Sequence, residues 1–380
     1  MSDVRLLGSS RTDIKKLEIR PLFGSALPDV AKFLHGWPAN QDQGSAIQRC
    51  VREDSLSIEK RLRWLLVENP LATAASQHGL CIRDASGAIV GLLLSFPRVF
   101  LAGEERLLGL GSGGFFVEPH ARTLGFYLFK RYLQTPGYAF FFSTTCNADS
   151  GALWKRLGAC AVPNSDTEYI LPLDLEVMLP VFLAGRTSSA MAAAIARVVG
   201  RCAGPALRLF GRTATALTVE PCRDWAKLAE LFRRHRSPDW MTTDRSAAFL
   251  AWRYGEGSPS HPLDICVFRD TRGNEGWFSL GNTICGHQGQ IRGSVLLDAI
   301  WPREQMSFRD ILPAILQRVA SKADAIFLQP RLGVDYRDCS RWIIPYRLEA
   351  PQVFAIARKG GAPLAVSTLD LVPADGDSAL

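Results

Sequence analysis

The sequence predicts an α/β (α+β) protein made of two similar units, each with a mixed central sheet flanked by helices. Its length supports this, because 380 residues are about two to three times the usual length of one domain. In the first half, apolar runs follow one another as strand, helix and strand, an order that implies parallel pairing. The second half repeats landmarks of the first. With 47% hydrophobic and 21% charged residues, the composition is that of a packed globular protein.

Charge and cysteine content exclude several classes of protein. Lys and Arg exceed Asp and Glu by 44 to 37 without forming a basic run, so we expect an anionic ligand and no nucleic acid. The nine cysteines include no Cys-x-x-Cys pair, which argues against structural zinc and disulfides. At the N-terminus, basic residues precede any long apolar run, which argues against a secretory signal. No run approaches the ~20 apolar residues of a membrane span. We therefore expect a cytoplasmic protein with no metal; oligomeric state stays open.

Hydrophobic periodicity places the elements of the first half in order. The second expected helix ends at Asn69-Pro70, because proline disfavours helical backbone in the residue before it. Asp84 and Gly87 supply a turn between two β-rich runs. The expected strands are residues 18–23, 79–83, 88–96, 107–117 and 138–144, and the expected helices are residues 28–37, 57–68, 124–133 and 147–158, the last capped by Asn147 or Asp149.

The expected strand at 107–117 is unusual because it contains glycines at 109, 111, 113 and 114. Glycine inside a strand indicates a bulge or a ligand that lies close to the backbone. The alternative is a flexible loop followed by a shorter strand at 115–117.

Residues 176–215 are expected to form a basic helical connector. Between residues 181 and 215 there are five arginines, at 186, 197, 201, 208 and 212, and no acidic residue. Pro205 should kink or break the helix. These arginines either face solvent or form a surface for anionic lipid or an acidic carrier protein.

Four landmarks repeat in the same order in the two halves. Arg83-Asp84-x-x-Gly87 matches Arg269-Asp270-x-x-Gly273, 186 residues later, and Pro119 matches Pro302, 183 residues later. The other two pairs are Arg63-Trp64 with Trp252-Arg253-Tyr254, and residues 140–142 with 326–328. In the second half we expect strands at 265–269, 276–280 and 294–301 and a helix at 308–321. The expected division is 1–175, connector 176–215 and a degenerate second unit, 216–380.

The turn from Val117-Glu118-Pro119 into Arg122-Thr123-Leu124-Gly125-Phe126-Tyr127 is the strongest functional motif. A strand that leads directly into a helix exposes unpaired backbone N–H groups at the positive helix end, which suits a pyrophosphate. The motif resembles the acyl-CoA-binding motif of the GNAT acetyltransferase superfamily, Val-x-Pro followed by Arg/Gln-x-x-Gly-x-Gly/Ala. Tyr127 departs from it, since a small residue is usual there. The resemblance covers residues 18–172 in order.

The resemblance implies an N-acyltransferase, most simply an N-acetyltransferase, that moves an acyl group directly from acetyl-CoA or another acyl-CoA to an amine of a small molecule. The implied enzyme class is that of the acyltransferases that transfer groups other than aminoacyl groups. The implied cofactor-binding residues are Phe115, Phe116 and Val117 along the pantetheine, Arg122, Thr123, Leu124, Gly125, Phe126 and Tyr127 around the pyrophosphate, and Asn147 after the next strand.

Catalytic residues are not identified by the sequence. Trp154 occupies the place of the Tyr that usually protonates the thiolate, and indole is not a useful acid. Since a thiol has a pKa near 8.5, losing that acid costs only about 2 kcal/mol at pH 7. Glu118, His120 and Asp149 are weak candidates for the base, each also interpretable as a loop or cap residue. Cys146 is expected to be a buried structural thiol rather than a nucleophile.

The role of the second unit and the identity of the acyl donor remain open. The turn after Pro302 carries Glu304 and no Arg-x-x-Gly pattern, so the second unit is expected to have lost CoA binding and to shape the acceptor site or brace the first unit. Its Trp252-Arg253-Tyr254 cluster either lines an acceptor pocket or packs in the core. The donor is alternatively an acyl carrier protein docked on the basic connector, or the protein is an inactive acyl-CoA-binding scaffold.

Overall fold

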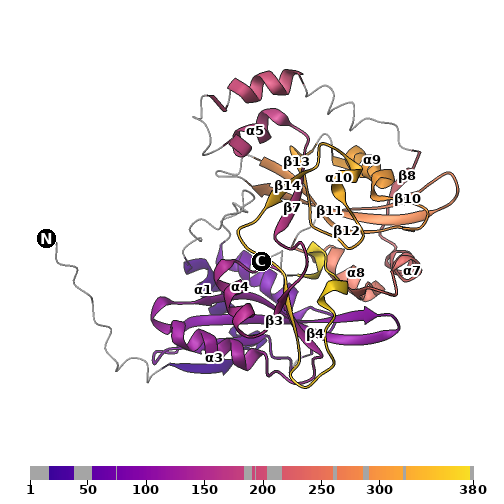
Figure 1. The fold of residues 1–380 in the computed structure, drawn as a ribbon. Helices are drawn as coiled ribbons and strands as arrows, with labels where there is room; N and C mark the ends of the chain where they lie inside the picture. The colour runs from indigo at the N-terminus through magenta and orange to yellow at the C-terminus, as the bar shows by residue number, and fades with distance from the viewer. Residues whose placement is uncertain are drawn as a thin grey trace.

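The structure is a computed structural model that describes residues 17–37, 54–73, 75–183, 191–192, 194–202, 216–259, 263–285, 291–319 and 322–376. Two mixed sheets lie one above the other, the first built mainly from the N-terminal half and the second mainly from the C-terminal half (Figure 1). No helix among the described residues is long and apolar enough to cross a membrane.

The first sheet has the strand order β1-β2-β3-β4-β5-β15-β6. Its first four strands pair antiparallel, and the fifth runs parallel to the fourth. These five strands confirm the expected order and are β1 (Glu18–Pro21), β2 (Gly79–Arg83), β3 (Ile89–Ala102), β4 (Glu105–Val117) and β5 (Phe140–Ser143). Two short strands extend the sheet beyond β3, namely β9 (Met241–Thr243) and β16 (Leu369–Asp370).

The second sheet repeats this arrangement. Its strands β8 (Thr218–Pro221), β10 (Asp264–Arg269), β11 (Glu275–Cys285) and β12 (Ile291–Ile300) pair antiparallel, and β13 (Ala325–Leu328) runs parallel to β12. The two repeated turns also match: Asp84 and Asp270 each accept two backbone N–H bonds through Oδ1. Gly87 and Gly273 have φ values of 85° and 87°, which explains glycine at both positions. The repeat predicted from the sequence is thus a repeat of structure.

The two sheets exchange one strand each. β7 (Thr167–Pro172) leaves the first half and lies in the second sheet between β13 and β14 (Ile344–Arg347). In return β15 (Phe354–Ala357) leaves the second half and lies between β5 and β6 (Cys160–Ala161). Each sheet therefore needs a strand from the other part of the chain, while the division at residue 175 stays a prediction.

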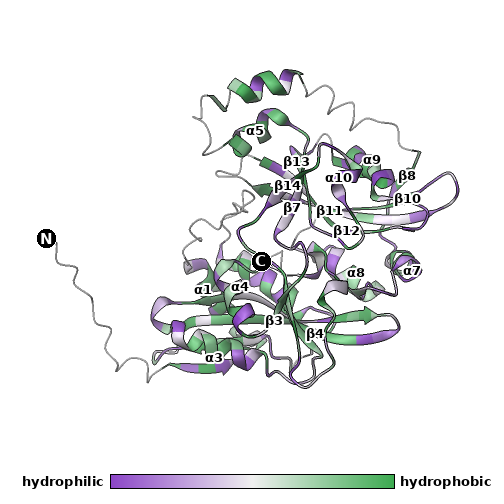
Figure 2. Ribbon diagram, in the orientation of Figure 1, coloured by the Kyte–Doolittle hydropathy of each residue, from purple (hydrophilic) through white to green (hydrophobic). Residues whose placement is uncertain are grey.

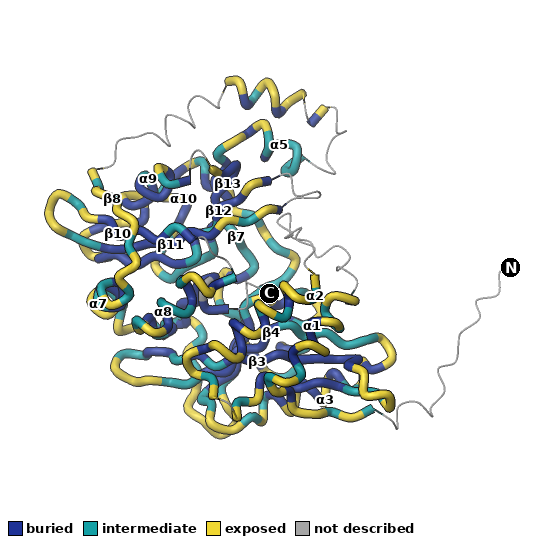
Figure 3. Tube along the Cα trace, turned by 180° about the vertical axis from the view of Figure 1, so that it is seen from behind, coloured by how far each residue is buried: buried dark blue, intermediate teal, exposed yellow. Residues whose placement is uncertain are grey.

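Helices cover both faces of each sheet, and the strands and the helices packed on them share the buried apolar residues (Figures 2 and 3). On the first sheet, α1 (Leu27–Gly36) and α2 (Ser55–Leu62), continued by a π-helical turn η3 (Arg63–Val67), pack on one face. The opposite face is covered by α3 (Arg122–Tyr132) and α4 (Ala148–Arg156). On the second sheet, α7 (Trp225–His235) and α8 (Ala247–Tyr254) face α9 (Phe308–Val319) and α10 (Tyr336–Cys339) across the strands.

The expected basic connector is described only in part. It includes α5 (Leu175–Leu183), with Pro180 inside it, and a helical stretch over residues 191–192 and 194–202. Arg197 and Arg201 are exposed on this stretch, as expected. The other positions to which the sequence drew attention, 186, 205, 208 and 212, lie outside the described residues.

Candidate functional site

The first candidate site is the place where β4 and β5 diverge. These parallel strands pair from Gly109 and Phe140 to Ser112 and Ser143, after which β5 ends and β4 continues to Val117. The backbone of residues 113–117 therefore lacks β5 as a partner on that side. A register shift against β3 accompanies the divergence, and Gly114 lies there with a φ of 59°. The glycine-rich segment is thus a strand with a bulge, and the flexible-loop alternative is wrong.

The other glycines of β4 have a different purpose. A Cβ atom on Gly111 would lie 2.5 Å from the Phe96 ring and 2.9 Å from the Phe142 ring. One on Gly109 would lie 2.9 Å from the rings of Phe100 and Phe140. Gly109 and Gly111 thus make room for aromatic side chains packed on the sheet, whereas Gly114 lies in the bulge with a positive φ.

The start of α3 lies directly after β4, joined by the 3-10 turn η4 (Pro119–Ala121). Its N-cap, Ala121, has no side-chain cap, and the first turn of α3 contains no acidic residue. Arg122 and Thr123 are exposed, as are Phe126 (42%) and Tyr127 (55%), while Leu124 is half-buried. The structure thus brings the expected pantetheine strand, 115–117, next to a helix start whose N–H groups are open to an anion.

Gly125 differs from its neighbours because it is buried. A Cβ atom there would lie 3.3 Å from Cγ2 of Val117 and 3.4 Å from the Phe115 ring. Glycine at this position therefore permits close packing of α3 on β4, which sets the helix start beside the end of the strand.

The residues that follow β5 have mainly structural contacts. Asn147 caps α4: its Oδ1 accepts the Ser150 N–H at 2.8 Å, whereas Asp149 lies exposed in the first turn. Trp154, 1% exposed, packs edge-on to Phe129 with ring centroids 4.9 Å apart. Cys146 is buried, as expected. Trp154 is therefore a core residue, and no proton donor replaces the usual Tyr at its position.

Glu118 and His120 contact each other, with Oε2 and Nδ1 3.3 Å apart and both side chains partly exposed. They stand beside the start of α3. Because a strand rises about 3.3 Å per residue, the three steps from Val117 to Gly114 place them roughly 10 Å along β4 from the bulge. The structure thus puts these two candidates at the pyrophosphate end of the site, away from the divergence of the strands.

One carboxylate that the sequence analysis did not name as a candidate lies near β5, on the side away from β4. Glu168, in β7, lines a cavity of about 50 Å³ between the two segments that cross between the sheets and residues 329–332 and 369–371. Its Oε2 is buried without a hydrogen-bond partner among the described residues, and burial raises its pKa to about 7. The cavity adjoins the end of β5, since Gln352 accepts the Cys146 N–H at 2.9 Å and Phe354 pairs with Ser143.

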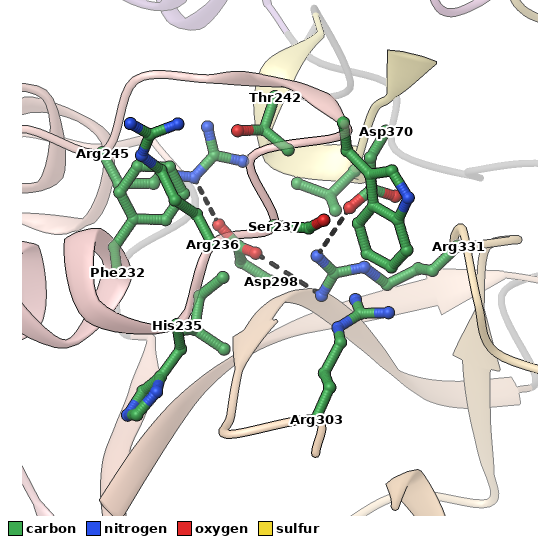
Figure 4. A pocket seen from close by; sticks show the side chains of 13 residues that line it. Phe232, His235, Arg236, Ser237, Thr242, Arg245, Asp298, Arg303, Arg331 and Asp370 are labelled. Carbon is green, nitrogen blue, oxygen red and sulfur yellow. Dashed lines mark hydrogen bonds and ion pairs between the residues drawn. The ribbon is translucent and has the colours of Figure 1, made fainter. Parts of the chain in front are cut away.

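A buried ionic network joins both sheets to the C-terminal segment. Arg245 donates through Nε to Asp298 at 2.6 Å and contacts Asp375 through Nη2 at 2.7 Å. Arg331 lies 3.2 Å from Asp370 and 3.7 Å from Asp298 (Figure 4). Burial lowers the pKa of Arg245, but the charges of Asp298 and Asp375 more than offset this and hold it above its usual value. Arg245 is therefore a permanent cation at the centre of the molecule.

Each half of the chain has a GNAT-like fold, a mixed sheet flanked by helices. No family model matches the sequence, and no curated protein matches it. Solved structures do match. N-myristoyltransferase of Saccharomyces cerevisiae, solved with bound myristoyl-CoA, is 12% identical with a TM-score of 0.57 over 93% of this chain and 80% of that one.

Two bacterial structures are similar to the same extent. A conserved protein of unknown function from Enterococcus faecalis, described as a probable N-acyltransferase, is 11% identical with a TM-score of 0.54, over 90% of this chain and 72% of that one. A GCN5-related N-acetyltransferase from Anabaena variabilis is 12% identical with a TM-score of 0.51, over the same shares of the two chains. At these identities the likeness concerns the fold.

Proposed function

We propose that the protein is an acyltransferase that takes its acyl group from acyl-CoA and passes it directly to an amine. The observation that carries this is the divergence of β4 and β5 beside the uncapped start of α3. A bound myristoyl-CoA in a structure of the same fold supports acyl-CoA as the donor. The proposal includes both acetyl-CoA and longer acyl-CoA as donors, and the proposed acceptor is a small-molecule amine.

The donor lies along the edge of β4 in this proposal. Backbone N–H groups of residues 122–127 hold the pyrophosphate, and the unpaired edge of residues 115–117 pairs with pantetheine. A backbone N–H at the bulge around Gly114 polarises the thioester carbonyl, since such a donor stabilises the oxyanion that develops during transfer. The side chain of Asn147 contributes its amide N–H₂, because its oxygen already caps α4.

Glu168 is the proposed base on the acceptor side. The acceptor amine gives a proton to the Glu168 carboxylate and attacks the thioester carbon; the new C–N bond forms, the C–S bond breaks, and CoA leaves as a thiolate that water protonates. A carboxylate with a pKa of about 7 is suited to this, because general bases work best when their pKa lies near the working pH.

The decisive assay follows thiol release from acetyl-CoA and myristoyl-CoA with a panel of amines. Wild-type protein is expected to turn over at least one pair. Removing a general base typically lowers the rate by about 10²- to 10⁴-fold, so Glu168→Gln should abolish measurable turnover while leaving donor binding intact. Glu220→Gln, an exposed position in β8, is the matched control and should keep full activity.

Tight acyl-CoA binding with no turnover on any amine would instead support the inactive scaffold. An acyl carrier protein as donor predicts salt-sensitive binding of that acidic carrier, weakened by Arg197→Glu and Arg201→Glu. These two residues are exposed, so the test is available without disturbing the core.

A further inference from the structure

A second cavity lies where β12 and β13 diverge, the place in the second half that corresponds to the donor cleft of the first. The two strands pair only over Gly293–Val295 and Ala325–Phe327. Asp298 and Ile300, further along β12, and Arg331, after the end of β13, line the cavity (Figure 4). The second half thus keeps an opening at the equivalent position, with different side chains in it.

The lining of this cavity holds more arginines than carboxylates. Four arginines line it, Arg236, Arg245, Arg303 and Arg331, against two carboxylates, Asp298 and Asp370. Arg245 also has Asp375 behind it, and Arg236 reaches the exposed Glu104 at 3.1 Å. Among the described residues no carboxylate lies within ion-pair distance of the fourth arginine, at position 303.

Arg303 is held firmly in place. Its guanidinium lies 4.4 Å from the ring centroid of Trp240 and 4.3 Å from that of Trp301, and its Nη1 donates to the Leu332 carbonyl at 2.6 Å. Burial, together with the charge of Arg331, lowers its pKa to about 10, so it stays charged at neutral pH. A fixed, largely buried cation that no carboxylate among the described residues contacts is a costly arrangement unless an anion joins it.

Unused hydrogen-bond donors surround the same cavity. Nε of Arg331, whose side chain is 6% exposed, is buried without a hydrogen-bond partner among the described residues. The same holds for Nη1 of Arg236 and for the hydroxyl of Thr242. Nε2 of His235, in the same lining, also lacks a partner among the described residues. Buried polar atoms are nearly always hydrogen-bonded in folded proteins, so four of them in one lining point to a polar occupant.

We propose that this cavity binds a small monocarboxylate, or the carboxylate group of a small molecule. A carboxylate offers two coplanar oxygens to guanidinium donors and one negative charge to balance Arg303. The cavity, about 20 Å³, is too small for a diphosphate. Asp298 and Asp370 in its wall would repel a doubly charged phosphate more than a monoanion.

Calorimetric titration of acetate into the full chain, without CoA and in a chloride buffer of constant ionic strength, tests this proposal. One saturable site in the millimolar range is expected for so small a ligand. Arg303→Gln should weaken binding at least tenfold. Arg236→Gln should also weaken binding and covers the case in which Arg303→Gln fails to fold. Arg272→Gln, on the exposed β10–β11 turn, should bind as wild type does.

Three results would overturn the proposal: no saturable acetate binding by the wild type, undiminished binding in Arg236→Gln, or tighter binding of inorganic phosphate than of acetate. Since the titration uses no donor and no amine, it stands or falls separately from the proposed acyl transfer.

Discussion

Trp64 and Trp252 stack face to face with ring centroids 4.7 Å apart, and each donates its indole N–H to the backbone carbonyl of the other, at 3.1 and 3.0 Å. The two residues are 188 positions apart and belong to matching landmarks of the repeat. Such reciprocal contact is what a two-fold axis between equivalent surfaces produces. The halves therefore meet as two copies of one unit would meet, and the exchange of β7 and β15 has the same reciprocal form.

This tryptophan pair should couple the stability of the two halves. Trp64→Phe and Trp252→Phe each remove one indole donor, for which we expect a loss of about 1 kcal/mol or more in the free energy of unfolding. The double variant should lose less than the sum of the two, by about 0.5–1.5 kcal/mol, because the rings also stack on each other. Urea denaturation of all four proteins measures the coupling; strict additivity would show that the pair does not act as a unit.

The ionic network at the centre should be essential for stability. Asp298→Ala leaves Arg245 and Arg331 short of a buried counter-charge, and breaking such a pair typically costs about 3–5 kcal/mol. Glu230→Ala, which removes an exposed partner of Arg233 and Arg234, is the control and should cost about 1 kcal/mol or less. Equal effects of the two substitutions in thermal unfolding would contradict the assigned role of the network.

The glycines of β4 should separate into two classes. Gly111→Ala forces a methyl group against the rings of Phe96 and Phe142, for which we expect a destabilisation of about 1–3 kcal/mol. Gly114→Ala places a side chain at positive φ in the bulge, at a cost of about 1–2 kcal/mol. Acyl-CoA affinity, measured by calorimetry on the folded variants, should fall for Gly114→Ala and remain near the wild-type value for Gly111→Ala. The reverse order would place the donor elsewhere.

Glu168 should make the protein less stable as pH rises. Burial raises its folded pKa from about 4.5 to about 7, so between these values the folded state holds a proton that the unfolded state has released. Its contribution to stability is therefore lost progressively from about pH 4.5 to pH 7. The Glu168→Gln side chain cannot ionise. At pH 8 we expect the free energy of unfolding of this variant to exceed that of the wild type by about 1–3 kcal/mol, with little difference at pH 4. A difference that does not change with pH would show that Glu168 titrates normally.

Local features of the fold were predictable from the sequence, and connections between distant parts were not. Periodicity and turn residues placed the strands β1 to β5 of the first sheet and the helices α1 and α3, because these signals depend on neighbours in the chain. The exchange of β7 for β15 left no such signal, because the sequence of a short apolar strand does not indicate which sheet the strand joins. Asp298 and Asp375 meet Arg245 from positions far apart in the sequence, so their network could not be anticipated.

The same distinction between local and distant signals applies to the residues of the candidate site. The cleft residues from Phe115 to Tyr127 follow one another along the chain, and the motif was enough to place them together. Glu168 comes 41 residues after Tyr127 and gains its raised pKa only from packing between crossing segments. A lone glutamate beside the apolar run Tyr169–Leu171 was the one sequence signal that a carboxylate had been built into a buried strand.

Calorimetric titration of acyl-CoA is the most direct test of the central claim that the first half alone holds the donor. We predict one saturable site per chain, weakened at least tenfold by Arg122→Glu at the open start of α3. Arg309→Glu, an exposed substitution in the first turn of the corresponding helix α9, should bind as the wild type does. Absence of binding by the wild type, or equal weakening by the two substitutions, would contradict the account.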